Sequence, residues 1–268
     1  IDPTKTEAWK ILKDFARKTN RGNYDLRKLF AEDTSRAKRL LKELNSQFDV
    51  DFSKNLIDDK TLSALLSLAK ETKLAESIEL MFTGKKINET ENRAVLHTAL
   101  RNVKRDAGGK LVAANGPVFV DGKDVMPGVI AVLEKMEGFV KKVQAGEWRG
   151  ASGKKIKNII NVGIGGSSLG PKMAAEALKP YKAGDINAYF LSNIDGNAVA
   201  DLMKKLDPEE TLVYVVSKTF TTQETMRNAR TLRSWVLEHY HGDESAIAKH
   251  FVAVSTAKEL VTKFGINA

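Results

Sequence analysis

The sequence predicts an α/β fold in which a doubly wound parallel sheet follows a helical N-terminal region. Two observations lead to this prediction. After residue 125, short apolar runs rich in β-branched residues alternate with helical stretches, which is typical of parallel strands covered on both faces. Before residue 100, apolar residues recur mainly at helical spacing. We therefore expect a helical region with a small hairpin at its end over residues 1–115, and an α/β domain over residues 116–268.

Three helical stretches are expected in the N-terminal region. The first covers residues 37–48, where Ala, Leu and Phe recur at helical spacing. A second apolar stripe covers residues 62–81 and stops at Gly84, a residue suited to ending a helix. The third is expected over residues 91–101, and we interpret His97 within it as a buried structural histidine rather than a catalyst.

The α/β domain begins with a helix expected over residues 126–144, which leads into the first of four strand-like runs. The runs read IKNIINVGI, INAYFLSNI, TLVYVVS and HFVAVST, and they occupy residues 156–164, 186–194, 211–217 and 250–256. Each run precedes a helical stretch, so the strands are expected to be parallel. Doubly wound sheets bind ligands outside the carboxyl ends of their strands, which directs attention to the loops that follow these runs.

Composition narrows the possible functions. The chain of 268 residues has no cysteine, which excludes disulfides, thiolate metal sites and cysteine nucleophiles. The sequence has no apolar run of 18 residues, so no membrane span is predicted, and a cytoplasmic location is the simplest expectation. The net charge of +9 favours phosphorylated ligands, but most basic residues are dispersed along helices. We therefore expect no specific nucleic-acid partner, with salt-dependent association through the net charge as the weaker alternative.

The loop after the third strand concentrates a lysine and four hydroxyl groups. Ser217, Lys218, Thr219, Thr221 and Thr222 lie where the strand ends, just before a helix expected to begin near residue 223. First-turn N–H groups lack partners within a helix and carry the positive end of its dipole, so they bind phosphate well. Capping of the helix is the alternative interpretation, but a single hydroxyl suffices for a cap. The surplus of hydroxyls favours a phosphate site.

The loop after the first strand is rich in glycine and serine. Gly163, Gly165 and Gly166 permit tight turns and close backbone approach, and Ser167 and Ser168 add hydroxyls. A dinucleotide-binding loop is the alternative, but the third glycine of its fingerprint would fall at Ser168. A P-loop is excluded because no Gly-Lys-Ser/Thr follows. We call residues 217–222 the hydroxyl-rich loop and residues 163–168 the glycine loop. Together the two loops fit a sugar phosphate, with its phosphate on the hydroxyl-rich loop and its carbon chain near the glycine loop.

Five motifs, which follow one another in order between residues 87 and 225, resemble the glucose-6-phosphate isomerase family. They read INETENRAVLHTALR (87–101), GEWRGASGKKI (146–156), VGIGGSSLGP (162–171), SNIDGN (192–197) and SKTFTTQET (217–225). The resemblance implies an aldose–ketose isomerase with two sugar-isomerase (SIS) domains and no metal or cofactor. Such an enzyme interconverts glucose 6-phosphate and fructose 6-phosphate in glycolysis and gluconeogenesis, by ring opening and proton transfer between C1 and C2 through a cis-enediol.

The resemblance also implies which residues bind the substrate. Carried onto matching positions, they are Gly166 and Ser167 from the glycine loop, with Ser217, Lys218, Thr219, Phe220, Thr221 and Thr222 from the hydroxyl-rich loop. Two departures concern fine contacts. Asn197 and Ala198 stand where the family commonly has Thr-His, and Ser168 stands where it often has Asp.

No catalytic residue of the family falls on a matching motif of this chain. The glutamate base, the arginine that steadies the enediolate, a histidine and a second lysine are expected after residue 268. The resemblance thus implies an amino-terminal portion that comprises the helical region and the first SIS domain, without the second, and that is inactive alone. The full-length protein is expected to be a homodimer. The alternative function is a non-catalytic SIS module that senses a sugar phosphate.

Overall fold

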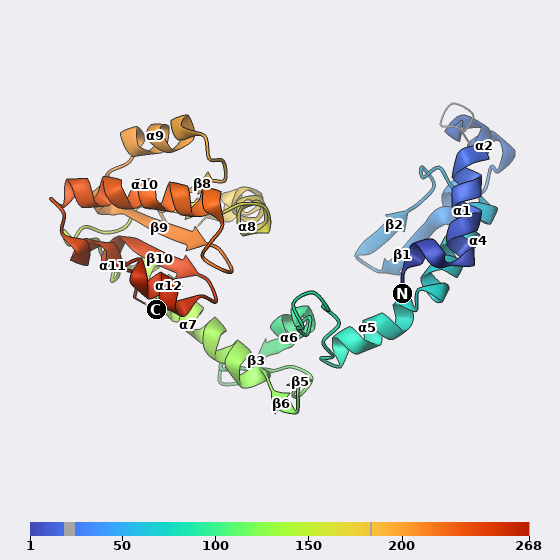
Figure 1. Ribbon diagram of the computed structural model, residues 1–268, viewed down its shortest axis with the longest axis horizontal. Helices are drawn as coiled ribbons and strands as arrows, with labels where there is room; N and C mark the ends of the chain where they lie inside the picture. Colours follow the sequence, from blue (N-terminus) through green and yellow to red (C-terminus); the bar gives the residue numbers. More distant parts are fainter. Residues whose placement is uncertain (19–24, 183, 268) are drawn as a thin grey trace. The chain divides into compact units, whose positions relative to one another are not determined.

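The computed structural model describes residues 1–18, 25–182 and 184–267 (Figure 1). The chain folds into two compact units, Ile1–Ala131 and Val132–Ala268, and the boundary between them falls within helix α7 (Met126–Ala145). This helix coincides closely with the one predicted over residues 126–144. The domain boundary expected at 115/116 stays a prediction.

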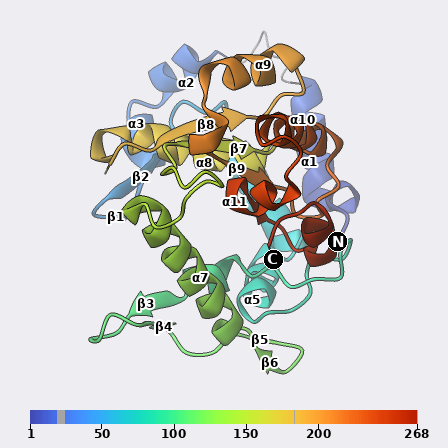
Figure 2. The same ribbon diagram turned by 90° about the vertical axis from the view of Figure 1, so that its left-hand side faces the viewer.

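Short helices and two-stranded hairpins make up the first unit. Its helices are α1 (Glu7–Lys18), α2 (Leu26–Glu32), α3 (Arg36–Leu40), α4 (Asp59–Glu71), α5 (Leu74–Phe82) and α6 (His97–Arg101). Its strands are β1 (Leu41–Asn45), β2 (Phe48–Asp51), β3 (Val103–Arg105), β4 (Leu111–Ala113), β5 (Phe119–Val120) and β6 (Lys123–Asp124). They pair as the antiparallel hairpins β1–β2, β3–β4 and β5–β6, of which the last two are drawn in green in Figure 2. Helix α1 packs on α4.

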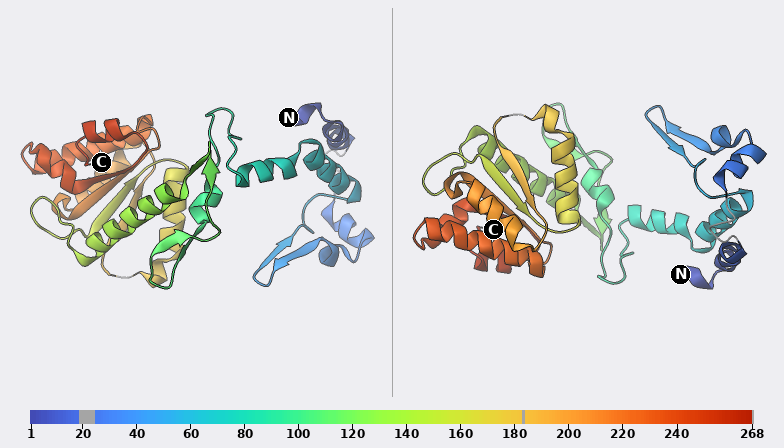
Figure 3. Two further views of the ribbon diagram at one scale, coloured as in Figure 1. Left: turned by 90° about the horizontal axis from the view of Figure 1, so that it is seen from below. Right: turned by 90° about the horizontal axis from the view of Figure 1, so that it is seen from above.

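The prediction of a helix over residues 37–48 was wrong beyond Leu40. The chain turns instead into the β1–β2 hairpin, drawn in blue in Figure 3. The Asn45 side chain accepts a hydrogen bond from the Gln47 N–H at 2.9 Å, and this local bond favours a turn over a helix. Beyond the turn, Phe48 and Val50 alternate with polar residues, a period-2 pattern that favours a strand.

The prediction of a helix over residues 91–101 was also too long, because α6 comprises only its second half. Asn92 adopts a left-handed conformation with φ of +48°, which an α-helix does not accommodate. The Asn88 side chain meanwhile accepts from the Glu91 N–H at 3.2 Å and stabilises a turn. His97 is exposed at the start of α6, so its interpretation as a buried histidine was wrong.

The apolar stripe over residues 62–81 does form helix, interrupted where Lys73 takes a left-handed φ of +58° between α4 and α5. Gly84 lies just past the end of α5 with a φ of +73°, as predicted. A Cβ at this position would lie 2.2 Å from the Phe119 carbonyl oxygen, so the close approach also requires glycine.

The second unit contains a four-stranded parallel sheet, which confirms the predicted α/β architecture. Its strands are β7 (Asn158–Val162), β8 (Asn187–Leu191), β9 (Thr211–Val216) and β10 (Phe251–Val254), in the order β10-β9-β7-β8. Its further helices are α8 (Gly166–Ala177), α9 (Gly196–Lys205), α10 (Gln223–His239), α11 (Ile247–His250) and α12 (Lys258–Lys263), with a 3₁₀ turn, η3 (Pro208–Glu210), before β9.

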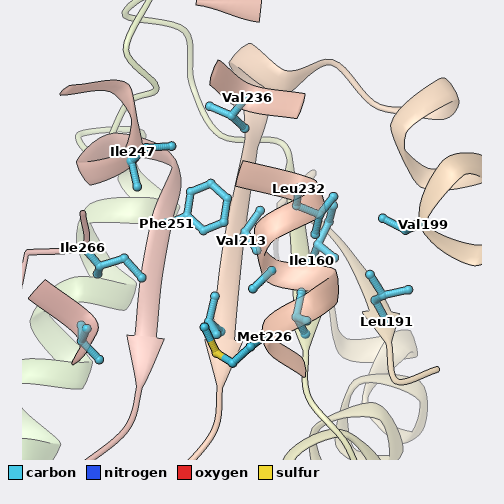
Figure 4. Close-up of a cluster of buried hydrophobic side chains, with 14 of the residues drawn as sticks. Ile160, Leu191, Val199, Val213, Met226, Leu232, Val236, Ile247, Phe251 and Ile266 are labelled. Atoms are coloured by element: carbon cyan, nitrogen blue, oxygen red, sulfur yellow. The ribbon is translucent and has the colours of Figure 1, made fainter. Parts of the chain in front are cut away.

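Both faces of this sheet are covered, because alternate residues of its strands pack against different helices. Val213 and Val215 of β9 lie in a buried cluster with Leu232 of α10 (Figure 4). The intervening residues Leu212 and Tyr214 belong to a second cluster that includes α7 residues. Burial on both faces explains why the strands read as continuous apolar runs.

The strand order changes direction next to β7. The chain runs from β7 to β8 on one side, and then returns across the sheet to β9 on the other side, followed by β10. Strands β7 and β9 are therefore neighbours, although β8 lies between them in the sequence. Ligands of open α/β sheets bind at such a switch point, outside the carboxyl ends of the strands.

Candidate functional site

The two loops singled out in the sequence lie side by side at the switch point. Val162 pairs with Val215 at the ends of β7 and β9. A Cβ on Gly163 would lie 3.1 Å from the Val216 carbonyl oxygen and 2.8 Å from that of Ser167. Glycine is therefore needed where the glycine loop passes the end of β9, immediately before Ser217.

The hydroxyl-rich loop presents most of its polar side chains to solvent. Lys218, Thr219, Thr221 and Thr222 are exposed, whereas Ser217 is buried at 3% exposure. The Thr219 and Thr221 hydroxyls lie 2.7 Å apart, and those of Ser217 and Thr222 lie 3.3 Å apart. The hydroxyls thus form two pairs within one turn of chain, and each hydroxyl carries a donor that can rotate toward an acceptor oxygen.

Helix α10 begins at Gln223, as the sequence predicted, and its N-terminus lacks the side-chain cap of the alternative interpretation. Thr222 occupies the N-cap position and makes no side-chain cap hydrogen bond among the described residues. Helix α9, by contrast, is capped by Asp195, whose carboxylate accepts from the Asn197 N–H at 2.9 Å. The Thr222 hydroxyl and the first-turn N–H groups of α10 are therefore available to an anion, and capping does not account for the threonines.

Phe220 anchors the hydroxyl-rich loop in the core. Its backbone takes a left-handed φ of +57°, and its side chain is 4% exposed. The ring meets Phe264 edge-on, with centroids 5.7 Å apart. Because its side chain is buried, Phe220 contributes to the surface of the loop only through its backbone. Its neighbours Thr219 and Thr221 are exposed to solvent.

The turn after β10 holds the same loop from the other side. The Lys218 carbonyl oxygen accepts hydrogen bonds from the Thr256 N–H at 3.0 Å, the Thr256 hydroxyl at 2.9 Å and the Ser255 hydroxyl at 3.1 Å. The run HFVAVST was predicted only as a strand, so Ser255 and Thr256 were not among the predicted site residues. A hydroxyl pair that follows a strand at the same sheet edge is the signal that could have found them.

The glycine loop is held by a contact that depends on a proline. Pro171 lies inside α8 and has no N–H to donate to the Ser167 carbonyl, its partner four residues earlier. The Asn161 side-chain amide of β7 donates to that oxygen instead, at 3.1 Å. Next to it, the Ser168 hydroxyl is buried and has no hydrogen-bond partner among the described residues. The structure thus fixes Ser167 through its main chain, while Gly166 is exposed.

A third loop, SNIDGN after β8, is tied to α10. The buried Asn228 side chain donates to the Asn193 carbonyl at 2.8 Å. The family departures at Asn197 and Ala198 fall in the first turn of α9, where Ala198 packs against the core.

Within the described parts of the chain, His, Cys, Asp and Glu form no cluster of three suited to a metal ion. No helix among the described residues combines the length and apolarity that crossing a bilayer requires.

These features place the chain among α/β proteins in which a glycine-rich and a hydroxyl-rich loop meet at the switch point of a parallel sheet. The chain belongs to the phosphoglucose isomerase family, because the model of that family matches residues 51–268.

A solved structure supports the same relationship. A glucose-6-phosphate isomerase from Chlamydia trachomatis D/UW-3/Cx is 27% identical, with a TM-score of 0.68. The match covers 94% of this chain and 44% of the chlamydial chain, so the present chain spans less than half of that protein's length. A hypothetical protein from Thermus thermophilus matches more weakly, at 24% identity and a TM-score of 0.42, over 52% of this chain and 31% of its own.

Proposed function

We propose that this chain supplies the phosphate-binding half of an active site that interconverts glucose 6-phosphate and fructose 6-phosphate. Membership of the phosphoglucose isomerase family supports this reaction over the alternative of a non-catalytic sensor. The observation that carries the proposal is the loop after β9, which offers four hydroxyls, a lysine and an uncapped helix N-terminus at one end of a strand.

In this proposal the phosphate lies over residues 217–222. The hydroxyls of Thr219, Thr221 and Thr222 and the first-turn N–H groups of α10 donate to its oxygens, and Lys218 adds a positive charge. Ser217 donates from the buried end of the loop. Gly166 and Ser167 contact the sugar from the neighbouring glycine loop. The phosphate thereby orients the carbon chain for proton transfer between C1 and C2, a positioning role that accounts for much of catalysis on small substrates.

The catalytic acid and base are not assigned to residues of the two loops. Ring opening and proton transfer need an acid and a base within reach of C1 and C2. The SIS-domain organisation and a homodimer belong to the same proposal and are implied by the family resemblance. A cytoplasmic location, expected from the composition, belongs to it as well.

Calorimetric titration of the 268-residue chain with fructose 6-phosphate tests the proposal. Binding is expected for fructose 6-phosphate and for inorganic phosphate, in competition, and not for fructose. Thr219→Ala and Thr222→Ala are each expected to weaken fructose 6-phosphate binding by about 1–3 kcal/mol, because a charged acceptor loses a donor.

Thr231→Ala provides the matched control. This threonine lies on α10, and its hydroxyl donates at 3.1 Å to the Arg227 carbonyl within the same helix. Its removal is expected to leave binding unchanged. Unaltered affinity in both the Thr219 and Thr222 variants would contradict the assignment of the phosphate site.

A further inference from the structure

The Lys218–Thr219 peptide is held more firmly than its local structure requires. Three donors converge on the Lys218 carbonyl oxygen, namely the Thr256 N–H at 3.0 Å, the Thr256 hydroxyl at 2.9 Å and the Ser255 hydroxyl at 3.1 Å. The Thr256 N–H alone would satisfy this carbonyl. Both hydroxyl bonds join residues far apart in the sequence, 37 and 38 positions, so they are not local turn bonds.

The three hydrogen bonds on the Lys218 carbonyl also fix the direction of the Thr219 N–H, because both groups belong to the same peptide. In a trans peptide the C=O of one residue and the N–H of the next point in opposite directions. The three donors hold the Lys218 carbonyl toward the turn after β10, so the Thr219 N–H points away from that turn. This N–H has no backbone acceptor among the described residues. Thr219 itself is exposed, which leaves its N–H open to a ligand on the loop.

The opposite orientation of this peptide would harm anion binding. Rotation of the peptide plane would replace a donor with a carbonyl oxygen, whose negative end would face the phosphate. Anion sites work by donors that are oriented before the ligand arrives, because no free energy is then spent on reorientation. Loss of the Ser255 and Thr256 hydroxyls would make the rotated peptide more accessible.

We propose that Ser255 and Thr256 are positioning residues for the phosphate, which act by fixing the Lys218–Thr219 peptide with its N–H toward the ligand. This inference rests on the proposed function of the loop. Neither residue contacts the ligand in this scheme. A purely structural role is the competing explanation, and Ser255 does have one local bond, accepting from the Ala257 N–H at 3.1 Å.

The test compares Thr256→Val, Ser255→Ala and the double variant with the wild-type 268-residue chain. Valine keeps the shape of threonine and the backbone N–H, and removes only the hydroxyl. Both hydrogen bonds are at exposed positions, so little loss of stability in urea unfolding is expected. The double variant is expected to bind both inorganic phosphate and fructose 6-phosphate roughly tenfold more weakly, the equivalent of one charge-assisted hydrogen bond. Thr256→Ser, which keeps the hydroxyl that valine removes, is expected to bind both ligands with most of the wild-type affinity.

The amide NMR signal of Thr219 reports on contact with the ligand, and it does not depend on the stability of the variant. Phosphate is expected to shift the Thr219 amide proton strongly downfield in the wild-type chain, and much less in the double variant. Wild-type affinity and an unchanged Thr219 shift in the double variant would overturn the positioning role while leaving the phosphate site intact. Absence of phosphate and fructose 6-phosphate binding in the wild-type chain would instead overturn the proposed function, and this inference with it.

Discussion

Phe220 combines a strained backbone conformation with a buried side chain that stabilises the fold. A left-handed conformation costs a residue with a Cβ about 1–2 kcal/mol, and glycine avoids this cost. The chain tolerates φ of +57° because the ring is 4% exposed and packs against Phe264. Burial of a phenylalanine contributes more than the strain costs. The strained residue thus lies between Thr219 and Thr221 and turns both hydroxyls toward solvent.

The strain at Phe220 predicts that its glycine variant is more stable than its alanine variant, although glycine removes more of the side chain. Phe220→Ala is expected to destabilise the chain by about 3–5 kcal/mol, through the loss of buried aromatic surface. Phe220→Gly removes even more side chain, yet it is expected to be about 1 kcal/mol more stable than Phe220→Ala because glycine accepts the left-handed φ. Urea unfolding of both variants measures the difference. An alanine variant as stable as the glycine variant, or more so, would show that the conformation relaxes on truncation.

His250 lies fully buried at the opposite end of the sheet, as the last residue of α11 just before β10, in a geometry that defines its protonation. Its Nδ1 lies 2.8 Å from the Thr211 carbonyl oxygen, which only accepts, so Nδ1 carries the proton. Its Nε2 accepts from the Ala151 N–H at 3.0 Å and lies 3.1 Å from the Tyr240 hydroxyl. A second proton on Nε2 would oppose the Ala151 N–H. Burial accordingly lowers the pKa of His250 below its ordinary value of 6.5.

The sign of the resulting pH dependence follows from this lowered pKa. Below about pH 6.5 the unfolded chain protonates this histidine and the folded chain does not, so stability falls as pH decreases toward the native pKa, by at most about 1.4 kcal/mol per pH unit. The charged groups nearby are Asp207 just before η3, Glu209 on η3, Lys154 that pairs with both, and His239 on α10. Urea unfolding at about pH 7.5, 6.5 and 5.5 should show a steeper loss for the wild-type chain than for His250→Gln. Equal slopes would contradict the assignment.

Strand β7 and helix α8 meet at the edge of the site. Asn161 of β7 replaces the donor that Pro171 removes from α8, and Gly163, directly after β7, lets the chain pass the end of β9. The position of the glycine loop beside the hydroxyl-rich loop therefore depends on one side-chain amide and on the absence of one Cβ.

Gly163→Ala tests this dependence. The new Cβ would contact the Ser167 carbonyl at 2.8 Å and the Val216 carbonyl at 3.1 Å, so the two loops must separate. A loss of stability of about 1–3 kcal/mol, with weaker fructose 6-phosphate binding, is expected. Gly170→Ala in α8 is the control, because a Cβ there meets nothing within 4 Å. It should leave binding unchanged and raise stability by up to about 1 kcal/mol. Similar behaviour of the two variants would contradict the argument.

In the molecule as a whole, the candidate site belongs to one compact unit. Every residue assigned to it lies within Val132–Ala268, whereas the family match begins at residue 51 in the other unit. The glycine loop, the hydroxyl-rich loop and the turn after β10 all follow strands of the same parallel sheet. The sheet alone brings the three loops to one edge.

Ligand protection should therefore be confined to the second unit. At about 100 times its Kd, fructose 6-phosphate stabilises a protein that binds it only when folded by about 2.7 kcal/mol. Hydrogen exchange is expected to slow in β7, β9 and the first turn of α10, and to stay unchanged in α4 and α5. Equal protection of α4 and α5 would place ligand contacts in the first unit and revise the site.

Sequence patterns were sufficient for the parallel strands and for the composition of the two loops. Strands buried on both faces read as apolar runs whatever their neighbours, and α7 and the start of α10 lay within about two residues of their predicted positions. The same reading failed over residues 37–48 and 91–101. Leu41, Leu44 and Phe48 are 41%, 62% and 59% exposed, so their spacing carried no information about a buried face.

Tertiary structure decided what no local pattern contains. The strand order places β9 beside β7 although β8 intervenes in the sequence. The three hydrogen bonds on the Lys218 carbonyl join residues 37 and 38 positions apart, and the His250 tautomer depends on Thr211, 39 positions away. Local propensity and periodicity describe the preferences of neighbouring residues. The orientation of a donor toward a ligand depends on contacts that form only when distant segments pack together.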